Sequence, residues 1–429
     1  MVLGPISHGA GDRVRRMVSE RSHRVHRMRR IALYSHDAQG LGHMRRNLAI
    51  ADAFAEDGET SVLLVSGARE AGLFPLPRNT DLLTLPALRK GDDSRYSSRS
   101  LGLELDEMVG LRSQVLGSAL MAYAPDVFVV DKLPGGVENE LLPCLRRLTD
   151  QGTRLVLGLR EVLDDPARVR RDWERSSFEA VVRAFYDAIW VYGDPRVYDP
   201  VEEYGMPEDL AERVRYSGYI DRRQGRPLTA AEATAQRAAL DLPAGPIALA
   251  MAGGGEDGFQ LLEAFARSRM PEGATGLMVT GPMMPDAQRE ALEALAEGRD
   301  DLRLIPFIQD GDQLIRLADR VVCMAGYNTT CEVLASGSRA LLVPRVHPRE
   351  EQLIRAERLS ELGAVDFLHP RDLSPAAVSA WLTMPLAPAE RLIPPMDLGG
   401  LRRLPALMAD VLRRPTCRAL PERPRVAFA

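Results

Sequence analysis

The sequence predicts an α/β protein with two doubly wound parallel sheets in series. Apolar runs alternate with helical stretches from residue 30 onward, which is typical of parallel strands joined by crossover helices. The alternation stops at 221–229, DRRQGRPLT, and then starts again. At 429 residues the chain is also longer than a typical single domain with one hydrophobic core.

Each half of the chain supplies its own set of strands. We expect strands in the first half at 30–36, 61–67, 81–86, 126–132, 154–160, 188–193 and 214–220, with helices at 42–56, 101–123 and 166–186. In the second half we expect strands at 247–252, 276–280, 302–308, 320–325, 339–344 and 365–369, with helices between them and a last helix at 398–413. Two Rossmann-like domains follow from this order.

These elements set the expected domain limits. The domains cover 30–220 and 230–385, joined by a linker at 221–229 and followed by a tail, 386–429, whose helix returns to the first domain. Residues 1–29 form a leader that we expect to be poorly ordered. Between Arg13 and Arg30 it carries eight arginines against Glu20 alone. Such a segment suits either solvent or an anionic membrane surface, where each basic residue contributes about 1 kcal/mol.

Bulk properties exclude several classes of protein. The net charge of -5 argues against a nucleic-acid-binding body. The chain has neither an apolar run long enough to span a membrane nor the apolar core of a signal peptide. The four cysteines lack CxxC spacing and are expected to be reduced and buried. We therefore expect a cytoplasmic protein, with peripheral association at the inner face of the membrane left open by the basic leader.

The most informative segment is 323–345, CMAGYNTTCEVLASGSRALLVPR. An apolar strand leads through Gly326 to a short helix, and free N–H groups at such a helix start, near Asn328 and Thr329, attract a diphosphate. Glu332, about one turn further, would accept hydrogen bonds from a ribose diol. The alternative is an ordinary strand–helix–strand unit with a solvated glutamate.

A second motif, 40–51, GLGHMRRNLAIA, follows the first expected strand. Gly40 and Gly42 permit a tight turn, which places His43 at a helix N-terminus facing the crevice. The helix dipole, equivalent to about +0.5 charge there, would lower the pKa of His43 and keep its imidazole neutral, as a general base requires. Alternatively, His43 caps the helix or forms part of the crevice wall.

The 323–345 segment resembles the donor-binding motif of GT-B glycosyltransferases, most closely the peptidoglycan UDP-N-acetylglucosamine transferase family. In that family a glutamate matching Glu332 binds the nucleotide ribose. The segment 347–356, HPREEQLIRA, resembles the family's His and Gln-Gln helix start, which recognises sugar hydroxyls. Gln352 matches the second Gln, but Glu351 replaces the first, and a carboxylate accepts hydrogen bonds without donating any. The identity of the sugar is therefore left open.

The resemblance implies further donor contacts. Gly253, Gly254 and Gly255 match the loop that contacts the diphosphate, Arg222 the arginine that reaches the phosphates, and Ile308 the residue that reads the nucleobase edge. Other residues nearby have plainer expected roles. We expect Asp257 to cap a helix, the DGD at 310–312 to cap another, and Arg223 and Arg226 to be solvated linker charges.

Acceptor-side candidates follow strands of the first domain. Glu161, Asp164 and Asp165 follow the strand at 154–160, where one could act as a base or bind the acceptor. The alternative is a solvated loop in which Asp165 caps the helix that starts at Pro166. Asp131 and Lys132 end another crevice strand and would either touch the acceptor or pair with a neighbour.

The resemblance implies a GT-B hexosyltransferase with an interdomain cleft. It would move a hexosyl group from a nucleotide sugar, a UDP-sugar first and a dTDP-sugar second, to the hydroxyl of a saccharide, lipid-linked sugar or small metabolite. We expect inversion at the anomeric carbon, with His43 or a carboxylate at 161–165 as base, and neither a metal nor a cofactor. Residues 40–51 also resemble GxGHxxRxLxLA of a UDP-sugar hydrolase. Hydrolysis, 2-epimerisation and non-catalytic nucleotide-sugar binding stay open as alternatives.

Overall fold

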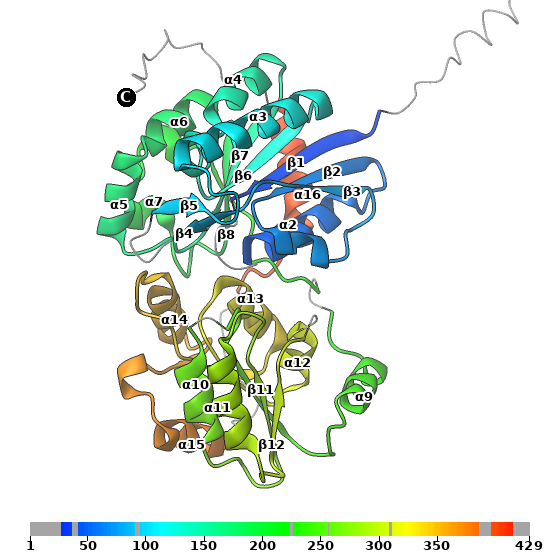
Figure 1. Ribbon diagram of the computed structural model, residues 1–429, viewed down its shortest axis with the longest axis vertical. Coiled ribbons are helices and arrows are strands. Elements are labelled where there is room, and N and C mark those ends of the chain that lie inside the picture. The colour runs from blue at the N-terminus through cyan, green and yellow to red at the C-terminus, as the bar shows by residue number, and fades with distance from the viewer. Residues whose placement is uncertain are drawn as a thin grey trace, which may run out of the picture.

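The computed structural model describes residues 27–36, 42–90, 95–223, 226–255, 257–308, 311–385 and 396–414. It contains one sheet of seven strands, in the order β3-β2-β1-β6-β7-β8-β9, and one of six, in the order β12-β11-β10-β13-β14-β15. Every strand pair in these two sheets is parallel. Figure 1 shows them as two stacked lobes. The predicted fold class is confirmed.

The first lobe is formed by the chain up to β9. Its strands are β1 (Arg29–Ser35), β2 (Thr60–Ser66), β3 (Thr80–Thr84), β6 (Val127–Asp131), β7 (Arg154–Arg160), β8 (Ala188–Tyr192) and β9 (Val214–Tyr216). Its longer helices are α2 (Gly42–Ala55), α3 (Leu105–Tyr123), α4 (Leu142–Asp150), α5 (Pro166–Arg175) and α6 (Phe178–Phe185); α7 (Pro200–Tyr204) and α8 (Glu208–Ala211) are short.

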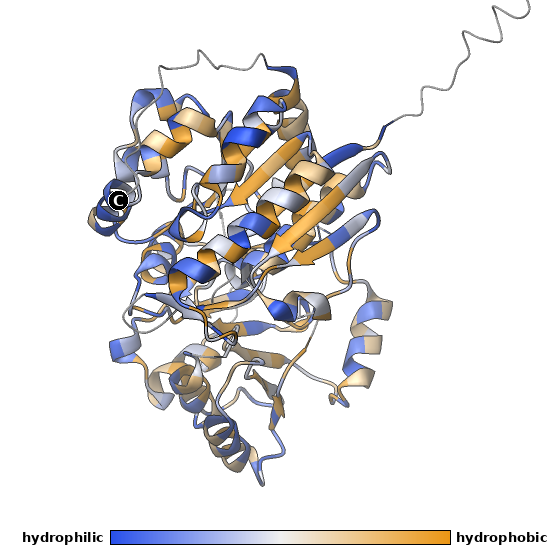
Figure 2. Cartoon of the chain, turned by 45° about the horizontal axis from the view of Figure 1, so that its top comes forward, coloured by the Kyte–Doolittle hydropathy of each residue, from blue (hydrophilic) through white to orange (hydrophobic). Residues whose placement is uncertain are grey.

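The second lobe repeats this alternation. Its strands are β10 (Ile247–Met251), β11 (Thr275–Val279), β12 (Leu302–Ile305), β13 (Arg320–Cys323), β14 (Arg339–Leu342) and β15 (Asp366–Phe367). Its helices are α9 (Ala230–Ala239), α10 (Phe259–Ala266), α11 (Asp286–Ala296), α12 (Gly311–Leu317), α13 (Tyr327–Ser336), α14 (Glu351–Glu361) and α15 (Pro375–Thr383). Central strands of both sheets, such as β6 and β10, are buried along their whole length. Figure 2 shows apolar strands in orange beside helices that carry both hydrophobic and hydrophilic residues.

The last described helix, α16 (Gly400–Arg413), lies on the first lobe although it follows the second in sequence. Leu401, Leu404 and Met408 join the apolar core that β1 and α2 share. The backbone N–H of Gly400 donates to Tyr219 O at 3.0 Å, and Arg403 donates to Ser217 O. The C-terminal helix therefore packs as part of the first lobe, as predicted. No helix in the described ranges is long and apolar enough to cross a membrane.

Two local predictions are wrong. The helix expected at 166–186 is two helices, because Ser177 adopts a left-handed conformation at φ 51° and interrupts the hydrogen-bond ladder. The strand expected at 214–220 ends at Tyr216, where the chain turns toward α16. The structure also contains an antiparallel hairpin, β4 (Leu88–Lys90) and β5 (Tyr96–Ser98), where no strands were predicted.

Candidate active site

A cavity of about 980 Å³ opens between the two lobes. Its wall includes residues at or just beyond the carboxyl ends of strands in both sheets, among them His36, Lys132 and Arg160 from the first lobe and Ala252 and Met324 from the second. This is where doubly wound sheets bind their ligands, because loops and helix N-termini converge there. The cavity is thus the candidate site on topological grounds alone.

The second lobe supplies a wall of glycines and a helix start. Gly253, Gly254 and Gly255 form the turn after β10 and line the cavity. Gly255 has φ 97°, and a Cβ there would lie 2.4 Å from Thr280 O, so only glycine fits. Helix α13 begins after its N-cap Gly326, and Asn328 and Thr329 line the cavity beside its free N–H groups. Ile308 also lines the cavity.

Glu332 lies one turn into α13 and borders the same cavity. It is buried, and this burial raises the pKa of its carboxyl to about 7 in spite of the nearby Arg222 and Arg45. Arg222 Nη1 lies 3.7 Å from Glu332 Oε1. Arg222 borders a small side cavity next to Glu332 and not the main one.

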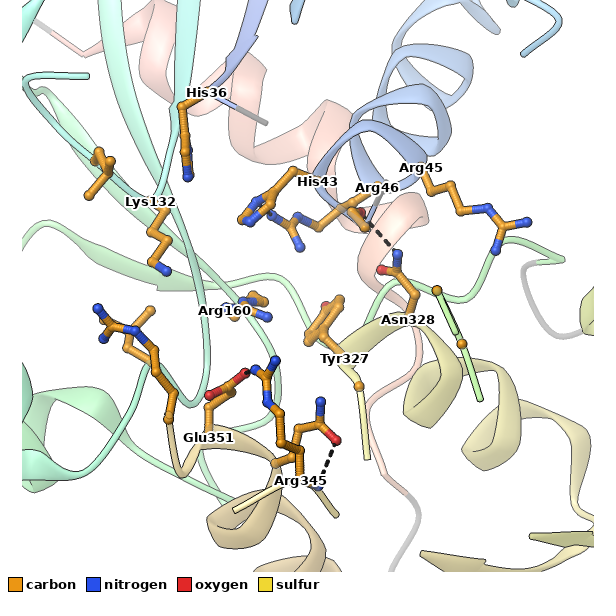
Figure 3. A pocket seen from close by; sticks show the side chains of 18 of the residues that line it. His36, His43, Arg45, Arg46, Lys132, Arg160, Tyr327, Asn328, Arg345 and Glu351 are labelled. Carbon is orange, nitrogen blue, oxygen red and sulfur yellow. Dashed lines mark hydrogen bonds and ion pairs between the residues drawn. The ribbon is translucent and has the colours of Figure 1, made fainter. Parts of the chain in front are cut away.

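The start of α14 forms the floor of the cavity (Figure 3). Gln352 Oε1 accepts a hydrogen bond from the backbone N–H of Arg345 at 3.2 Å, and Glu351 Oε1 accepts one from Arg345 Nη2 at 2.7 Å. Asp257 pairs with Arg345 Nη1 at 3.0 Å, while Gly258 occupies the N-cap position of α10 without a side-chain cap. The prediction that Asp257 caps a helix is therefore wrong: the carboxylate binds a guanidinium instead.

The first lobe supplies a histidine, a carboxylate and a guanidinium. His43, in the first turn of α2, lies with Nδ1 2.5 Å from Asp131 Oδ2, at the end of β6. Arg46, one turn along α2, donates to the same oxygen at 2.5 Å. Burial lowers the pKa of His43, and Asp131 acts against that shift. The expected direction of the shift holds, but desolvation is its main cause.

Glu161 and Asp164 are bound by arginines of the other lobe. Arg355 of α14 donates to Glu161 through Nε at 2.6 Å, and both side chains are fully buried. Asp164 accepts from Arg349 Nη1 at 2.9 Å and from the backbone N–H of Glu350 at 2.7 Å. Neither carboxylate lines the cavity. The structure therefore contradicts their predicted acceptor-side role and assigns them to the interface between the lobes.

Other predicted residues lie as follows. Asp165 caps α5, its side chain accepting from the Arg168 N–H at 3.0 Å, as predicted. Arg223 is not solvated, because it pairs with Glu232 at 2.8 Å and its side chain is only 11% exposed. Gly42 meets the second lobe, since its carbonyl accepts from Asn328 Nδ2 at 2.9 Å. Gly40, Asp310 and most of the leader lie outside the described residues.

The cavity-lining residues that sequence reasoning missed include Arg46, Arg160 and Tyr327. The spacing of His43 and Arg46, three apart on one helix, was the signal available for Arg46. Arg160 is the last residue of a predicted strand, but the site residues predicted at the end of that strand were only the acidic ones that follow it.

Comparison with known proteins agrees with this geometry. Residues 251–399 match the glycosyltransferase family 28 C-terminal domain. A UDP-N-acetylglucosamine–N-acetylmuramyl-(pentapeptide) pyrophosphoryl-undecaprenol N-acetylglucosamine transferase of Haemophilus influenzae is 29% identical over 122 residues, 28% of this chain and 35% of that protein. Its namesake from Burkholderia thailandensis is 40% identical over 100 residues, 23% of this chain and 27% of that protein. The chain thus spans about a third of these relatives' length.

Solved structures extend the likeness to both lobes. The calicheamicin glycosyltransferase CalG4 superposes with a TM-score of 0.58 at 16% identity, covering 90% of this chain and 99% of that one. MurG of Acinetobacter baumannii gives 0.54 at 16% identity, covering 90% and 99%. At such identity these neighbours establish the fold. The chain has the GT-B fold, and its residues 251–399 match the glycosyltransferase family 28 C-terminal domain.

Proposed function

We propose that this protein is a hexosyltransferase that moves a hexosyl group from a UDP-sugar to an acceptor hydroxyl, with inversion and without a metal. The observation that carries the proposal is one cavity with two unlike walls. One wall has the α13 N-terminus, the glycine turn and Glu332, which together suit a nucleoside diphosphate. The other has His43 backed by Asp131, which suits removal of a hydroxyl proton.

The donor binds to the second lobe in this proposal. Its diphosphate lies at the free N–H groups of α13 and against the Gly253–Gly255 turn, and its ribose hydroxyls donate to Glu332. Ile308 lies beside the base, and Arg222 assists from its place next to Glu332. Gln352 and Glu351 face the sugar. The relatives that match part of this chain are named as UDP-N-acetylglucosamine transferases, which supports uridine as the base.

The reaction follows from the orientation of His43. Asp131 holds the Nδ1 proton, so Nε2 is the basic nitrogen. The acceptor O–H proton passes to Nε2 while the acceptor oxygen bonds to the anomeric carbon. The bond from that carbon to the diphosphate oxygen breaks, and its electron pair leaves with UDP. The helix N-terminus of α13 stabilises the charge that develops on the leaving group.

The size of the cavity favours transfer over hydrolysis. It continues past His43 to an apolar wall of the first lobe that includes Leu133, Trp173 and Phe178, with the latter two rings stacked at 4.3 Å. A hydrolase needs room for one water molecule beside the sugar, whereas this extension suits an organic acceptor. A saccharide, a lipid-linked sugar and a small metabolite all fit this description.

Release of UDP from a panel of UDP- and dTDP-sugars, with and without candidate acceptors, tests the proposal. We expect saturable UDP-sugar binding that Glu332→Ala weakens, slow release without acceptor, and acceptor-dependent release that His43→Ala abolishes. Fast acceptor-independent release lost in His43→Ala would identify a hydrolase instead. Binding without any turnover across the acceptor panel, unaffected by His43→Ala, would identify a non-catalytic binding protein.

A further inference from the structure

Arg160 is a cation in the cavity wall that the proposed reaction does not use. It is the last residue of β7, and its side chain lies between the two lobes (Figure 3). No hydrogen bond or ion pair joins its guanidinium to another residue within the described ranges. Burial lowers the pKa of Arg160, which reflects the cost of keeping a charge out of water. Proteins rarely keep such a charge without a partner, so a ligand is the natural candidate.

The charges that face Arg160 come from three elements, α2, β6 and α14. Arg46 of α2 and Arg355 of α14 repel it, while Asp131 of β6 and Glu351 of α14 attract it. Both acids are already occupied: Asp131 by His43 and Arg46, and Glu351 Oε1 by Arg345. The local balance around Arg160 is therefore positive and suits an anion.

Lys132 adds a second cation at the same edge. It follows β6, and its backbone N–H donates to Gly158 O of β7 at 2.8 Å, which fixes the two strand ends side by side. Its φ of 68° turns the chain sharply at that point. The Lys132 ammonium and the Arg160 guanidinium point into the same part of the cavity in Figure 3.

Glu351 supplies an unmatched acceptor opposite these cations. Its Oε2 is buried and has no hydrogen-bond partner in the described part of the chain. A buried, unpaired carboxylate oxygen costs free energy unless a donor reaches it. A ligand that carries both a hydroxyl and an acidic group would satisfy Glu351 Oε2 and Arg160 together.

We propose that Arg160 and Lys132 bind a carboxylate or phosphate group, carried either by the sugar being transferred or by the acceptor beside it, while Glu351 Oε2 accepts a hydrogen bond from a neighbouring hydroxyl. The existence of this site follows from the residues of the cavity wall. Whether the sugar or the acceptor carries the acidic group rests on the proposed function. A guanidinium recognises either acid bidentately, which a lysine at the same place would not do.

Calorimetric titration with UDP-glucuronate and UDP-glucose tests the sugar as the source. If the sugar carries the acid, UDP-glucuronate binds about 10- to 100-fold more tightly than UDP-glucose, and Arg160→Met removes the difference. Arg175→Met is the matched control, because it removes one positive charge from an arginine at the cavity rim that is 80% exposed and paired with Asp172. The control should keep the preference.

Titration with inorganic phosphate and with glucuronate, both with and without saturating UDP, tests the acceptor as the source. Saturable binding that survives Arg175→Met but not Arg160→Met, together with equal affinity for the two UDP-sugars, assigns the acid to the acceptor. Anion binding that needs Arg160 in a protein that does not bind UDP would support the site and reject the proposed function. Equal behaviour of wild type and Arg160→Met in both titrations would overturn the proposal.

Thermal unfolding separates a ligand-binding arginine from a structural one. Removing a half-buried charge that has no ion-pair partner should leave the Tm of Arg160→Met unchanged or raise it in the absence of ligand. Arg160→Lys should fold and keep part of the anion affinity. A large fall in Tm for both variants would mean that Arg160 supports the fold, which would also overturn the proposal.

Discussion

Asp131 Oδ2 lies 2.5 Å from His43 Nδ1, and the two residues come from different elements of the first lobe. Arg46 donates to the same carboxylate oxygen, so Asp131 is held in place from one side while it orients His43 from the other. Burial lowers the pKa of His43, and the Arg46 guanidinium holds the pKa of Asp131 well below its usual range. The imidazole is thus neutral at pH 7 and has a permanent anion behind it.

Asp131→Asn tests this arrangement. An amide of the same size does not stabilise the imidazolium that forms during proton transfer, so we expect kcat to fall about 10²- to 10⁴-fold with UDP affinity unchanged. Steady-state kinetics and UDP titration on the same preparations measure both quantities. Because the two residues act as one unit, His43→Ala with Asp131→Asn should lose little more than His43→Ala alone. Full activity in Asp131→Asn would exclude the dyad.

Glu332 gives the donor site a pH dependence. Burial raises the pKa of its carboxyl from 4.5 to about 7, so the group is mostly protonated below pH 7 and ionised above it. Because an ionised carboxylate accepts from both ribose hydroxyls, UDP affinity should fall by up to about tenfold per pH unit below 7. The free energy of unfolding changes in the opposite direction with pH. Burial disfavours the ionised carboxylate, so the folded protein should become more stable as pH falls from 7 toward 4.5.

Glu332→Gln is the control for this prediction. The amide does not titrate, whereas the terminal phosphate of UDP titrates equally with both proteins, so the difference between the two affinity profiles isolates Glu332. Calorimetric titration with UDP between pH 5.5 and 8 measures it. Parallel profiles for the two proteins would show that Glu332 does not govern the pH dependence of donor binding.

The fold and the place of Glu332 at the cavity were predictable because both are local in sequence. Alternating apolar runs dictate the two parallel sheets, and the strand–turn–helix at 323–345 places Glu332 within a single segment. The hairpin at Leu88–Lys90 and Tyr96–Ser98 was not predictable in this way, because its short strands lie in a polar stretch without clear period-two alternation.

Long-range pairing accounts for most of what was missed. Glu161 and Arg355 are 194 positions apart, and no local pattern distinguishes a carboxylate that crosses to the other lobe from one that faces the cavity. For the same reason, the sequence does not distinguish an Asp131 that contacts the acceptor from one that pairs with a neighbour. In the structure Asp131 pairs with His43 and Arg46. Arg160 was missed because its lack of a paired acid arises only in the fold, where the two acids that face it, Asp131 and Glu351, bind other residues.

The Glu161–Arg355 pair should dominate the stability of the contact between the lobes. Both side chains are 0% exposed, so Glu161→Ala leaves a buried guanidinium unpaired, and we expect a loss of about 3–5 kcal/mol. Glu203→Ala is the matched control. It also breaks a pair between the lobes, with Arg358 at 2.6 Å, but those side chains are 30% and 42% exposed, so the loss should stay below about 1 kcal/mol. Denaturant unfolding of both variants measures the difference, and equal losses would contradict it.

Gly255 should be the most restrictive position of the donor loop. At φ 97° an alanine is strained, and its Cβ would lie 2.4 Å from Thr280 O and 3.0 Å from Met284 N, so the turn must move. If this turn holds the diphosphate, Gly255→Ala should weaken UDP binding about tenfold or more while leaving uridine affinity unchanged.

Gly273→Ala is the control that separates backbone strain from steric collision, because Gly273 has φ 68° but no atom within 4 Å of the added carbon. This variant should lower the free energy of unfolding by about 1 kcal/mol and leave UDP affinity intact. Equal weakening of UDP and uridine by Gly255→Ala would mean that the turn shapes the whole nucleotide site and not the diphosphate subsite.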